Sequence, residues 1–332
     1  MIKNNMDNII RHLDGSSITL LDIGARNGIH GRWAEIPKLL NVFGFEPDTD
    51  ECDKINENAH KLDYPLKCLP FALGNKQGES ATLNLCKDLG CSSLYQPNMP
   101  LVEQFYYGHN MEIMRTLDVT INRLDDISVE NDIQADAIKI DTQGYELEIL
   151  KGSTDLLKNT KLVELEVEFN EQYKDQPLFS DIDLFMRSQG YALLGLRRTY
   201  WRRKSNNFDL ESPFGGQIMH GDAIYYNEKL LNETESKIDV IKFCSIFSLY
   251  QQDDFISYLL TMPHKALESM PLDERIQLID DLLNKQTGLS LFLSKTIDLI
   301  RKKIWLPHTA LRRMLDKLQS KSAEDWHDPD FY

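Results

Sequence analysis

A glycine-spaced turn between two short apolar segments most constrains what this chain can fold into. The apolar run 18–23 leads into the turn Gly24–Gly28, and a second apolar run, 42–45, ends in Glu46. A strand, a tight turn against a helix start and a second strand ending in an acid are typical of the nucleotide pocket in a doubly wound α/β sheet. An ordinary strand–helix turn without a ligand is the alternative interpretation of the two glycines.

The composition of the turn favours one class of cofactor. A dinucleotide-binding turn carries a middle glycine so that the backbone can approach a pyrophosphate, whereas this chain has Arg26 there. The turn therefore suits a single nucleoside with an amino-acid tail, and S-adenosylmethionine is such a molecule. In that interpretation Glu46 accepts hydrogen bonds from two ribose hydroxyls. A nicotinamide-dependent oxidoreductase, the other enzyme considered, is disfavoured by Arg26.

Charge, cysteine content and hydropathy exclude several other classes. A net charge of −15 argues against a protein that coats nucleic acid, since such binding depends on neutralising phosphates. The five cysteines are scattered and include no C-x-x-C, which favours free thiols over a disulfide frame or a zinc site. No apolar stretch approaches the roughly 18 residues of a membrane span. We therefore expect a cytoplasmic protein without nucleic-acid partners or a membrane span.

Strand and helix patterns alternate over the first two thirds of the chain and then stop. Five or six apolar strand segments interleaved with helices predict a mostly parallel sheet with helices on both faces. The segment 87–109 is rich in Gly, Pro, Ser and Asn and predicts a long loop. From residue 229 the apolar residues recur only at helical spacing. We predict a sheet domain over 1–228 and an all-helical C-terminal region over 229–332.

Several short motifs occur together in one order: Asp22–Gly28, Gly90–Leu94, Lys139–Glu146, Glu166–Phe169, and Gly215–Gln217 with Asp222–Ala223. In this order and spacing they resemble the FkbM-type S-adenosylmethionine-dependent methyltransferases over about residues 18–228. The resemblance implies a class I methyltransferase domain, with a Rossmann-like sheet whose last strand is antiparallel. It also implies O-methylation, often of sugars or hydroxylated natural products, without implying which acceptor is used.

Cofactor-binding residues are expected at the carboxyl ends of the first strands, where the loops meet. Phe71 and Ala72 end the third strand, near where an adenine would lie. Ser92 and Ser93 offer hydroxyls and backbone N–H groups to the methionine end or to the acceptor. The full predicted set is Asp22, Gly24, Arg26, Asn27, Gly28, Glu46, Phe71, Ala72, Ser92, Ser93 and Asp141.

A sugar hydroxyl has to lose its proton when it is methylated, so a base or a metal should assist. The predicted catalytic residues are Asp141, Glu168 and His220. Asp141 and Glu168 would line the acceptor pocket, one as base, or both as ligands of a hard divalent cation such as Mg²⁺. Asp141 could instead be a helix N-cap, and His220 an exposed loop residue. Glu164 and Glu168 lie on a strand expected to be covered on both faces, where acids need partners unless that face is solvated.

A basic, aromatic segment precedes the last strand and is expected to overhang the acceptor as a linker. The predicted substrate-binding residues are Gln143, Tyr200, Trp201, Arg202 and Arg203. They favour an anionic or sugar-phosphate acceptor whose ring stacks on an aromatic side chain, although a solvated loop is the alternative. The leading function is O-methylation of a carbohydrate, glycoconjugate or hydroxylated natural product.

The helical region 229–332 allows other roles beside this one. It could support a homodimer, bind a partner from a biosynthetic cluster, or cover the acceptor site. The alternative to an enzyme is a non-catalytic scaffold that binds the cofactor and acts through this region. The small-molecule or glycan acceptor itself is not specified by the sequence.

Overall fold

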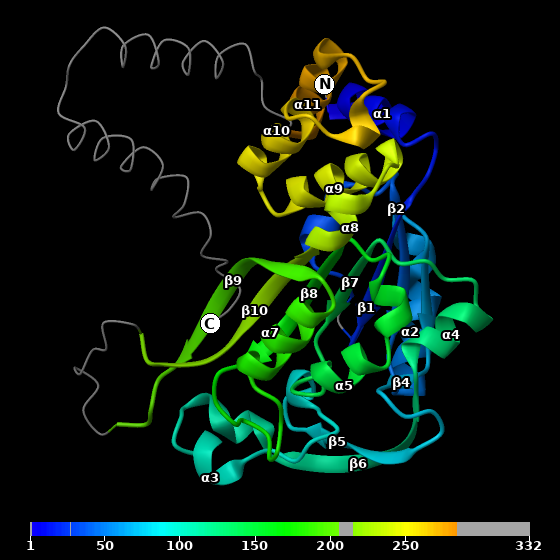
Figure 1. The fold of residues 1–332 in the computed structure, drawn as a ribbon. Helices are drawn as coiled ribbons and strands as arrows, with labels where there is room; N and C mark the ends of the chain where they lie inside the picture. Colours follow the sequence, from blue (N-terminus) through cyan, green and yellow to red (C-terminus); the bar gives the residue numbers. More distant parts are fainter. Residues whose placement is uncertain (1, 27, 206–214, 284–332) are drawn as a thin grey trace, which may run out of the picture. The chain divides into compact units, whose positions relative to one another are not determined.

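The computed structural model describes residues 2–26, 28–205 and 215–283 (Figure 1). Its main sheet has the strand order β3-β2-β1-β7-β8-β10-β9. The strands are β1 (Ile18–Ile23), β2 (Leu40–Phe45), β3 (Leu66–Leu69), β7 (Ala137–Ile140), β8 (Leu162–Glu168), β9 (Tyr191–Trp201) and β10 (Gln217–Asn227). Strands β1, β2, β3, β7 and β8 pair in parallel, and β10 is antiparallel to both of its neighbours. The predicted class I methyltransferase sheet with an antiparallel last strand is confirmed.

A smaller sheet of order β4-β6-β5 lies beside the main one. It contains β4 (Ala72–Leu73), β5 (Ser80–Cys86) and β6 (Ile113–Asn122). The third strand, expected to end at Phe71 and Ala72, ends at Leu69 because the chain then turns away and pairs with β6. The segment predicted as a long loop holds three short helices, η3 (Leu89–Cys91), α3 (Met99–Val102) and η4 (Tyr107–Met111).

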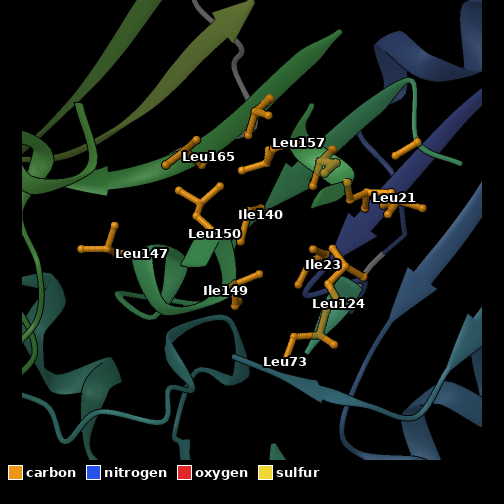
Figure 2. Packing of buried hydrophobic residues seen from close by; sticks show 14 of the residues in the cluster. Leu21, Ile23, Leu73, Leu124, Ile140, Leu147, Ile149, Leu150, Leu157 and Leu165 are labelled. Carbon is orange, nitrogen blue, oxygen red and sulfur yellow. The ribbon is translucent and has the colours of Figure 1, made fainter. Parts of the chain in front are cut away.

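The apolar core lies between one face of the main sheet and helices that follow its strands. These helices are α4 (Leu124–Glu130), α5 (Glu146–Lys151), α6 (Thr154–Leu157) and α7 (Phe179–Ser188). Figure 2 shows Leu21, Ile23, Ile140 and Leu165 of the sheet beside Leu147, Leu150 and Leu157 of the helices. Burial of this continuous apolar surface is the main term that holds the layers together.

Further helices precede, interrupt and follow the sheet: α1 (Ile2–His12), η1 (Gly31–Glu35), α2 (Thr49–Asn58), η2 (Ala59–Lys61), α8 (Glu228–Glu233), α9 (Lys237–Leu249), α10 (Asp253–Thr261), η5 (Lys265–Leu267) and α11 (Leu272–Leu283). Lys242 of α9 pairs with Asp136, just before β7, at 2.7 Å. The first compact unit of the chain runs from Met1 to Leu282, so α8 to α10 belong to the same unit as the sheet. A domain boundary at residue 228 stays a prediction.

Two further expectations concern membranes and thiols. None of the helices in the described ranges is long and apolar enough to cross a membrane. All five cysteines are buried free thiols.

Candidate active site

One face of the main sheet carries a row of polar side chains toward the carboxyl ends of its parallel strands. The strand register pairs Asp22 with Lys139, Lys139 with Glu164, and Asp222 with Glu166. Residues paired in this way point to the same face, and their sequence neighbours point to the other. The neighbours Ile138, Val163 and Leu165 lie in the apolar core of the opposite face. We call the following set the polar row: Asp22, Lys139, Asp141, Glu164, Glu166, Glu168, His220 and Asp222.

The centre of the polar row is a histidine–carboxylate pair. His220 Nδ1 lies 2.6 Å from Glu166 Oε1. Gln143 donates from Nε2 both to Glu166 Oε2 and to Asp141 Oδ1, the latter at 3.0 Å. The Tyr173 hydroxyl in turn donates to Gln143 Oε1 at 2.9 Å. The structure thus brings together the predicted residues Asp141, Gln143 and His220, with Glu166 joining them.

The charges around this pair set its protonation. Burial alone would lower the pKa of His220, but the neighbouring Glu166 carboxylate outweighs burial and raises it. Burial would likewise raise the pKa of Asp141, and the Lys139 ammonium at 3.4 Å and the hydrogen bond from Gln143 together lower it. Asp141 is therefore ionised at neutral pH, and His220 titrates above the usual histidine range.

The loop between β7 and α5 holds Gln143 in place through unusual backbone angles. Gln143 has φ +58° and Gly144 has φ +102°. The Ser93 hydroxyl donates to the backbone carbonyl of Gln143 at 2.7 Å. Glu146 accepts from both the Thr142 N–H and its hydroxyl, at 2.8 and 3.0 Å. Asp141 contacts Lys139 and Gln143 instead, and α5 has Tyr145 at its N-cap position, so the helix-cap interpretation of Asp141 is wrong.

Glu168 is the last residue of β8, but its side chain is buried and does not reach solvent. Its side chain is 1% exposed, and its Oε2, like Glu146 Oε2, has no hydrogen-bond partner in the described part of the chain. Burial and then the nearby Glu146 and Glu166 raise the pKa of Glu168 well above its usual range. Burial also raises the pKa of Glu146, to about 8. A catalytic role of Glu168, as base or as metal ligand, stays a prediction.

The divalent cation considered from the sequence has no ready-made cluster of ligands among the described residues. Within 2–26, 28–205 and 215–283, no group of three or more His, Cys, Asp or Glu side chains is placed to hold a metal ion. Asp141 and Glu168 therefore form no such group with their described neighbours. Asp141 is held by Lys139 and Gln143, and the binding of a divalent cation stays a prediction.

The cofactor end of the site begins where β1 ends. Gly24 has φ +83°, and a Cβ atom there would lie 2.1 Å from the backbone carbonyl oxygen of Asp141. Only glycine allows β1 and the loop after β7 to approach this closely. At the end of β2, Glu46 Oε1 accepts from the Asp48 N–H at 2.9 Å and from Arg26 at 3.4 Å. Arg26 also pairs with Asp48 at 3.1 Å, so its charge is engaged by carboxylates.

Asp22 provides a test of whether an aminoacyl nucleoside suits this end of the sheet. It is 1% exposed, and neither of its carboxylate oxygens has a hydrogen-bond partner among the described residues. Lys139 lies at 3.7 Å, beyond hydrogen-bond distance. A buried carboxylate without donors is costly, and the ammonium of a bound amino-acid group would supply them. The unpaired acceptor oxygens of Asp22 therefore fit S-adenosylmethionine, whose methionine part carries such an ammonium.

Replacing Asp22 with Asn is expected to weaken binding of S-adenosylhomocysteine about tenfold, because a charge-assisted hydrogen bond becomes a neutral one. Isothermal calorimetry measures the change, with the exposed Asp50→Asn variant as a control. Burial raises the pKa of Asp22 to about 6. Wild-type affinity should therefore fall as the pH drops through 6, where the carboxylate takes up a proton. An Asp22→Asn variant with wild-type affinity would rule out this contact.

Other predicted cofactor residues occupy supporting positions. Ser92 Oγ accepts from the Cys86 N–H at 3.2 Å, and Ser93 Oγ accepts from the Tyr95 N–H at 3.0 Å. These bonds shape the loop after β5, and Ser93 also positions Gln143. Phe71 packs against the apolar core and Ala72 begins β4. Gly28 has φ +77° with open space around it, and Asn27 lies outside the described residues.

The prediction of a linker in the basic segment is wrong, because most of this segment belongs to strand β9. Strand β9 continues through Trp201 because it pairs with β10 along its whole length, Trp201 lying opposite Gln217. Trp201 is 9% exposed and packs against Phe105 and Tyr107, with ring centroids at 5.8 and 5.1 Å. Its ring also meets His220 edge-on at 6.0 Å. Trp201 thus packs beside the catalytic candidate His220, and its contact with an acceptor stays a prediction.

Three other residues predicted to contact the acceptor lie in β9 or just beyond it. Tyr200 is half-buried within β9, and Arg202 and Arg203 are exposed just beyond it. The Arg203 guanidinium lies 4.9 Å from the centre of the Phe105 ring. Their contact with an acceptor stays a prediction.

Two residues that matter in this geometry are not among the predicted site residues, Glu166 and Lys139. Glu166 is hidden in the alternation of Glu164, Glu166 and Glu168, where the sequence favours only the last as the residue nearest the strand end. The energetic cost of burying an acid could have indicated Glu166, because each buried acid on this strand requires a partner. The same cost could have indicated Lys139, since it is a lysine within an apolar strand.

Comparison with known proteins adds sequence relationships to this geometry. The profile of the FkbM methyltransferase domain matches residues 22–193. Hexuronic acid methyltransferase AglP of Haloferax volcanii is 26% identical over 157 residues, which cover 47% of this chain and 58% of AglP. The 2-O-methyltransferase NoeI of Sinorhizobium fredii is 28% identical over 185 residues, covering 53% of this chain and 74% of NoeI. The chain therefore spans less than two thirds of AglP.

Solved structures also show likeness at low identity. Magnesium protoporphyrin IX methyltransferase from Synechocystis, with the cofactor bound, is 11% identical with a TM-score of 0.33, covering 68% of this chain and 79% of that one. TrmK from M. capricolum, in complex with S-adenosylhomocysteine, is 10% identical with a TM-score of 0.32, covering 82% of this chain and 97% of that one.

Proposed function

The chain belongs to the FkbM methyltransferase family, and from this premise we propose that it methylates a hydroxyl group of a sugar. It is an S-adenosylmethionine-dependent methyltransferase; the acceptor and the roles of individual residues are the proposal. The observation that carries it is the hydrogen-bonded pair of His220 and Glu166 within the polar row. A hydroxyl needs a base for methylation, whereas an ionised carboxylate acceptor does not.

The protein's part in the reaction is to orient a base and to hold the acceptor oxygen. The bound cofactor supplies an electrophilic methyl group. An ionised carboxylate only accepts hydrogen bonds, so Glu166 fixes the proton of neutral His220 on Nδ1. Nε2 then carries the lone pair that takes the hydroxyl proton. Gln143 holds the Glu166 carboxylate from the other side, in the way that a third group orients a catalytic base. Asp22 and Glu46 are the residues proposed to hold the ammonium and the ribose.

Two observations support a sugar, and an acidic one, as acceptor. The relatives AglP and NoeI are named as a hexuronic acid methyltransferase and a 2-O-methyltransferase. Exposed guanidinium groups at Arg202 and Arg203 follow strand β9, whose Trp201 touches His220. Arginine binds carboxylates in paired hydrogen bonds. We infer that these arginines attract the carboxylate of a uronic acid while one of its hydroxyls faces His220.

A panel of methyl acceptors tests the proposal. Purified protein is incubated with methyl-labelled S-adenosylmethionine and with glucuronic acid, galacturonic acid, glucose and a simple carboxylic acid, as free sugars and as glycosides. We expect label in a uronic acid glycoside as an ether that survives mild alkali, and a lower rate at high salt because exposed charges are screened. Label released by alkali would indicate a methyl ester and would contradict a hydroxyl acceptor. Transfer that prefers neutral sugars would contradict the acidic class.

A further inference from the structure

A side chain from the helical segment that follows the last strand, beyond the matched residues 22–193, reaches the polar row. Tyr250, which follows helix α9, donates its hydroxyl to Glu164 Oε2 at 2.7 Å. Both residues are buried, at 5% and 4% exposure. The bond links a helical segment far along the chain to strand β8, which lies two strands away from β1 in the sheet.

Glu164 is the most heavily satisfied acid of the polar row. Arg32 Nη1 lies 3.2 Å from Glu164 Oε1, and Arg197 Nη2 lies 3.6 Å from the same oxygen. The Arg32 guanidinium also lies 4.6 Å from the centre of the Tyr250 ring. Glu164 Oε2 accepts from Tyr250 at 2.7 Å and from Arg32 Nη1 at 3.4 Å, so Tyr250 gives the shorter of these two hydrogen bonds to a buried carboxylate.

The contacts of Glu164 affect the charge balance around Lys139, its neighbour in the strand register. Lys139 lies between Glu164 and Asp22 on adjacent strands, and its ammonium is 3.7 Å from Asp22 Oδ1. The same ammonium lies 3.4 Å from Asp141 Oδ2, so three carboxylates, Asp22, Asp141 and Glu164, share one ammonium. When Tyr250 and Arg32 satisfy Glu164, Lys139 stays available to keep Asp22 ionised.

We propose that Tyr250 is a positioning residue for the cofactor: by holding Glu164, it leaves Lys139 to Asp22 and so sets the charge that meets the cofactor's ammonium. This inference rests on Asp22 facing the cofactor, as proposed above. The helical segment after the last strand then contributes to the cofactor site itself. It does so through the hydrogen bond from Tyr250 to Glu164 and through the charge of Lys139, which lies between Glu164 and Asp22 in the strand register.

The test is a double-mutant cycle with S-adenosylhomocysteine as the probe, measured by calorimetry on the full chain. Tyr250→Phe should raise the dissociation constant about fivefold at pH 7, the size expected for one modest electrostatic coupling. In the Asp22→Asn background the same change should have almost no effect. The KM for S-adenosylmethionine should rise similarly while kcat at saturating cofactor stays within about twofold of the wild type.

A matched control separates coupling from disturbance of the helices. Tyr258→Phe removes a hydroxyl from α10 at a side chain that is 57% exposed and should leave affinity unchanged. Wild-type affinity in Tyr250→Phe, or an equal loss in both backgrounds, would overturn the inference. If Asp22→Asn itself bound the probe normally, the cofactor role of Asp22 would fail instead, so the two failures are distinguishable.

Discussion

Replacing His220 with Gln lowers the turnover number about 10²- to 10⁴-fold, the range expected for loss of a positioned general base. Glutamine is close in size and can still hydrogen-bond to Glu166, but it cannot take up a proton at neutral pH. Cofactor affinity should stay within about twofold, because His220 lies on β10, which is three strands away from β1 in the sheet. Steady-state kinetics with the best acceptor of the panel and calorimetry with S-adenosylhomocysteine measure the two quantities.

A matched control for this variant is His109→Gln, at an exposed histidine of the short helix η4. It should turn over at the wild-type rate. If His220→Gln also kept the wild-type turnover number, the base would have to be another member of the polar row, and Asp141, which is ionised at neutral pH, would be the next to test.

Gly24→Ala is expected to cost the most stability of any variant proposed for this chain, on the order of 3 kcal/mol or more. The added methyl group would meet the Asp141 carbonyl oxygen at 2.1 Å in a backbone conformation that L-residues rarely adopt. Strand β1 and the loop after β7 would have to separate, and Asp141 would move with the loop. Urea unfolding of the two proteins measures the difference in the free energy of unfolding.

Gly28→Ala provides the control because it shares the penalty of the positive φ angle but lacks the steric clash. Gly28 also has positive φ, at +77°, but no atom of the described residues other than its chain neighbours lies within 4 Å of the position that an alanine methyl group would take there. Its variant should lose only about 1 to 2 kcal/mol, the cost of the left-handed conformation. Equal losses in the two variants would show that the contact with Asp141 is not what requires Gly24.

Much of the fold was predictable because local patterns and topology agree. Apolar runs ending in Gly24 and Glu46 predicted parallel strands, and both end at the same edge of the sheet in the structure. The placement of Asp141 and His220 near each other followed from the antiparallel last strand, since the start of such a strand meets the ends of its neighbours. The helical character after residue 228 was also correct for the described part.

The errors arose where tertiary pairing decides the structure. Strand β9 reaches Trp201 because β10 pairs with it that far, although Arg197 to Arg203 resemble a polar linker by composition alone. Likewise, whether Glu166 or Glu168 meets His220 depends on side-chain direction across an antiparallel pair, where the diagonal neighbour is reached. Tyr250 could not be connected to Glu164 by any local pattern, since the two are joined only by packing of α9 on the sheet.

The central claim is that His220 is the base that removes the proton from the acceptor hydroxyl. The pH dependence of a single turnover tests it most directly, because the rate follows the ionisation of that base. Enzyme saturated with labelled S-adenosylmethionine is mixed with excess acceptor at pH values from 5 to 9. Glu166, Asp222 and Asp141 around His220 together raise its pKa above the ordinary 6.5. The rate should therefore rise with pH through a midpoint above 6.5 in the wild type and be low and flat in His220→Gln. The same pH profile in both proteins would contradict the claim.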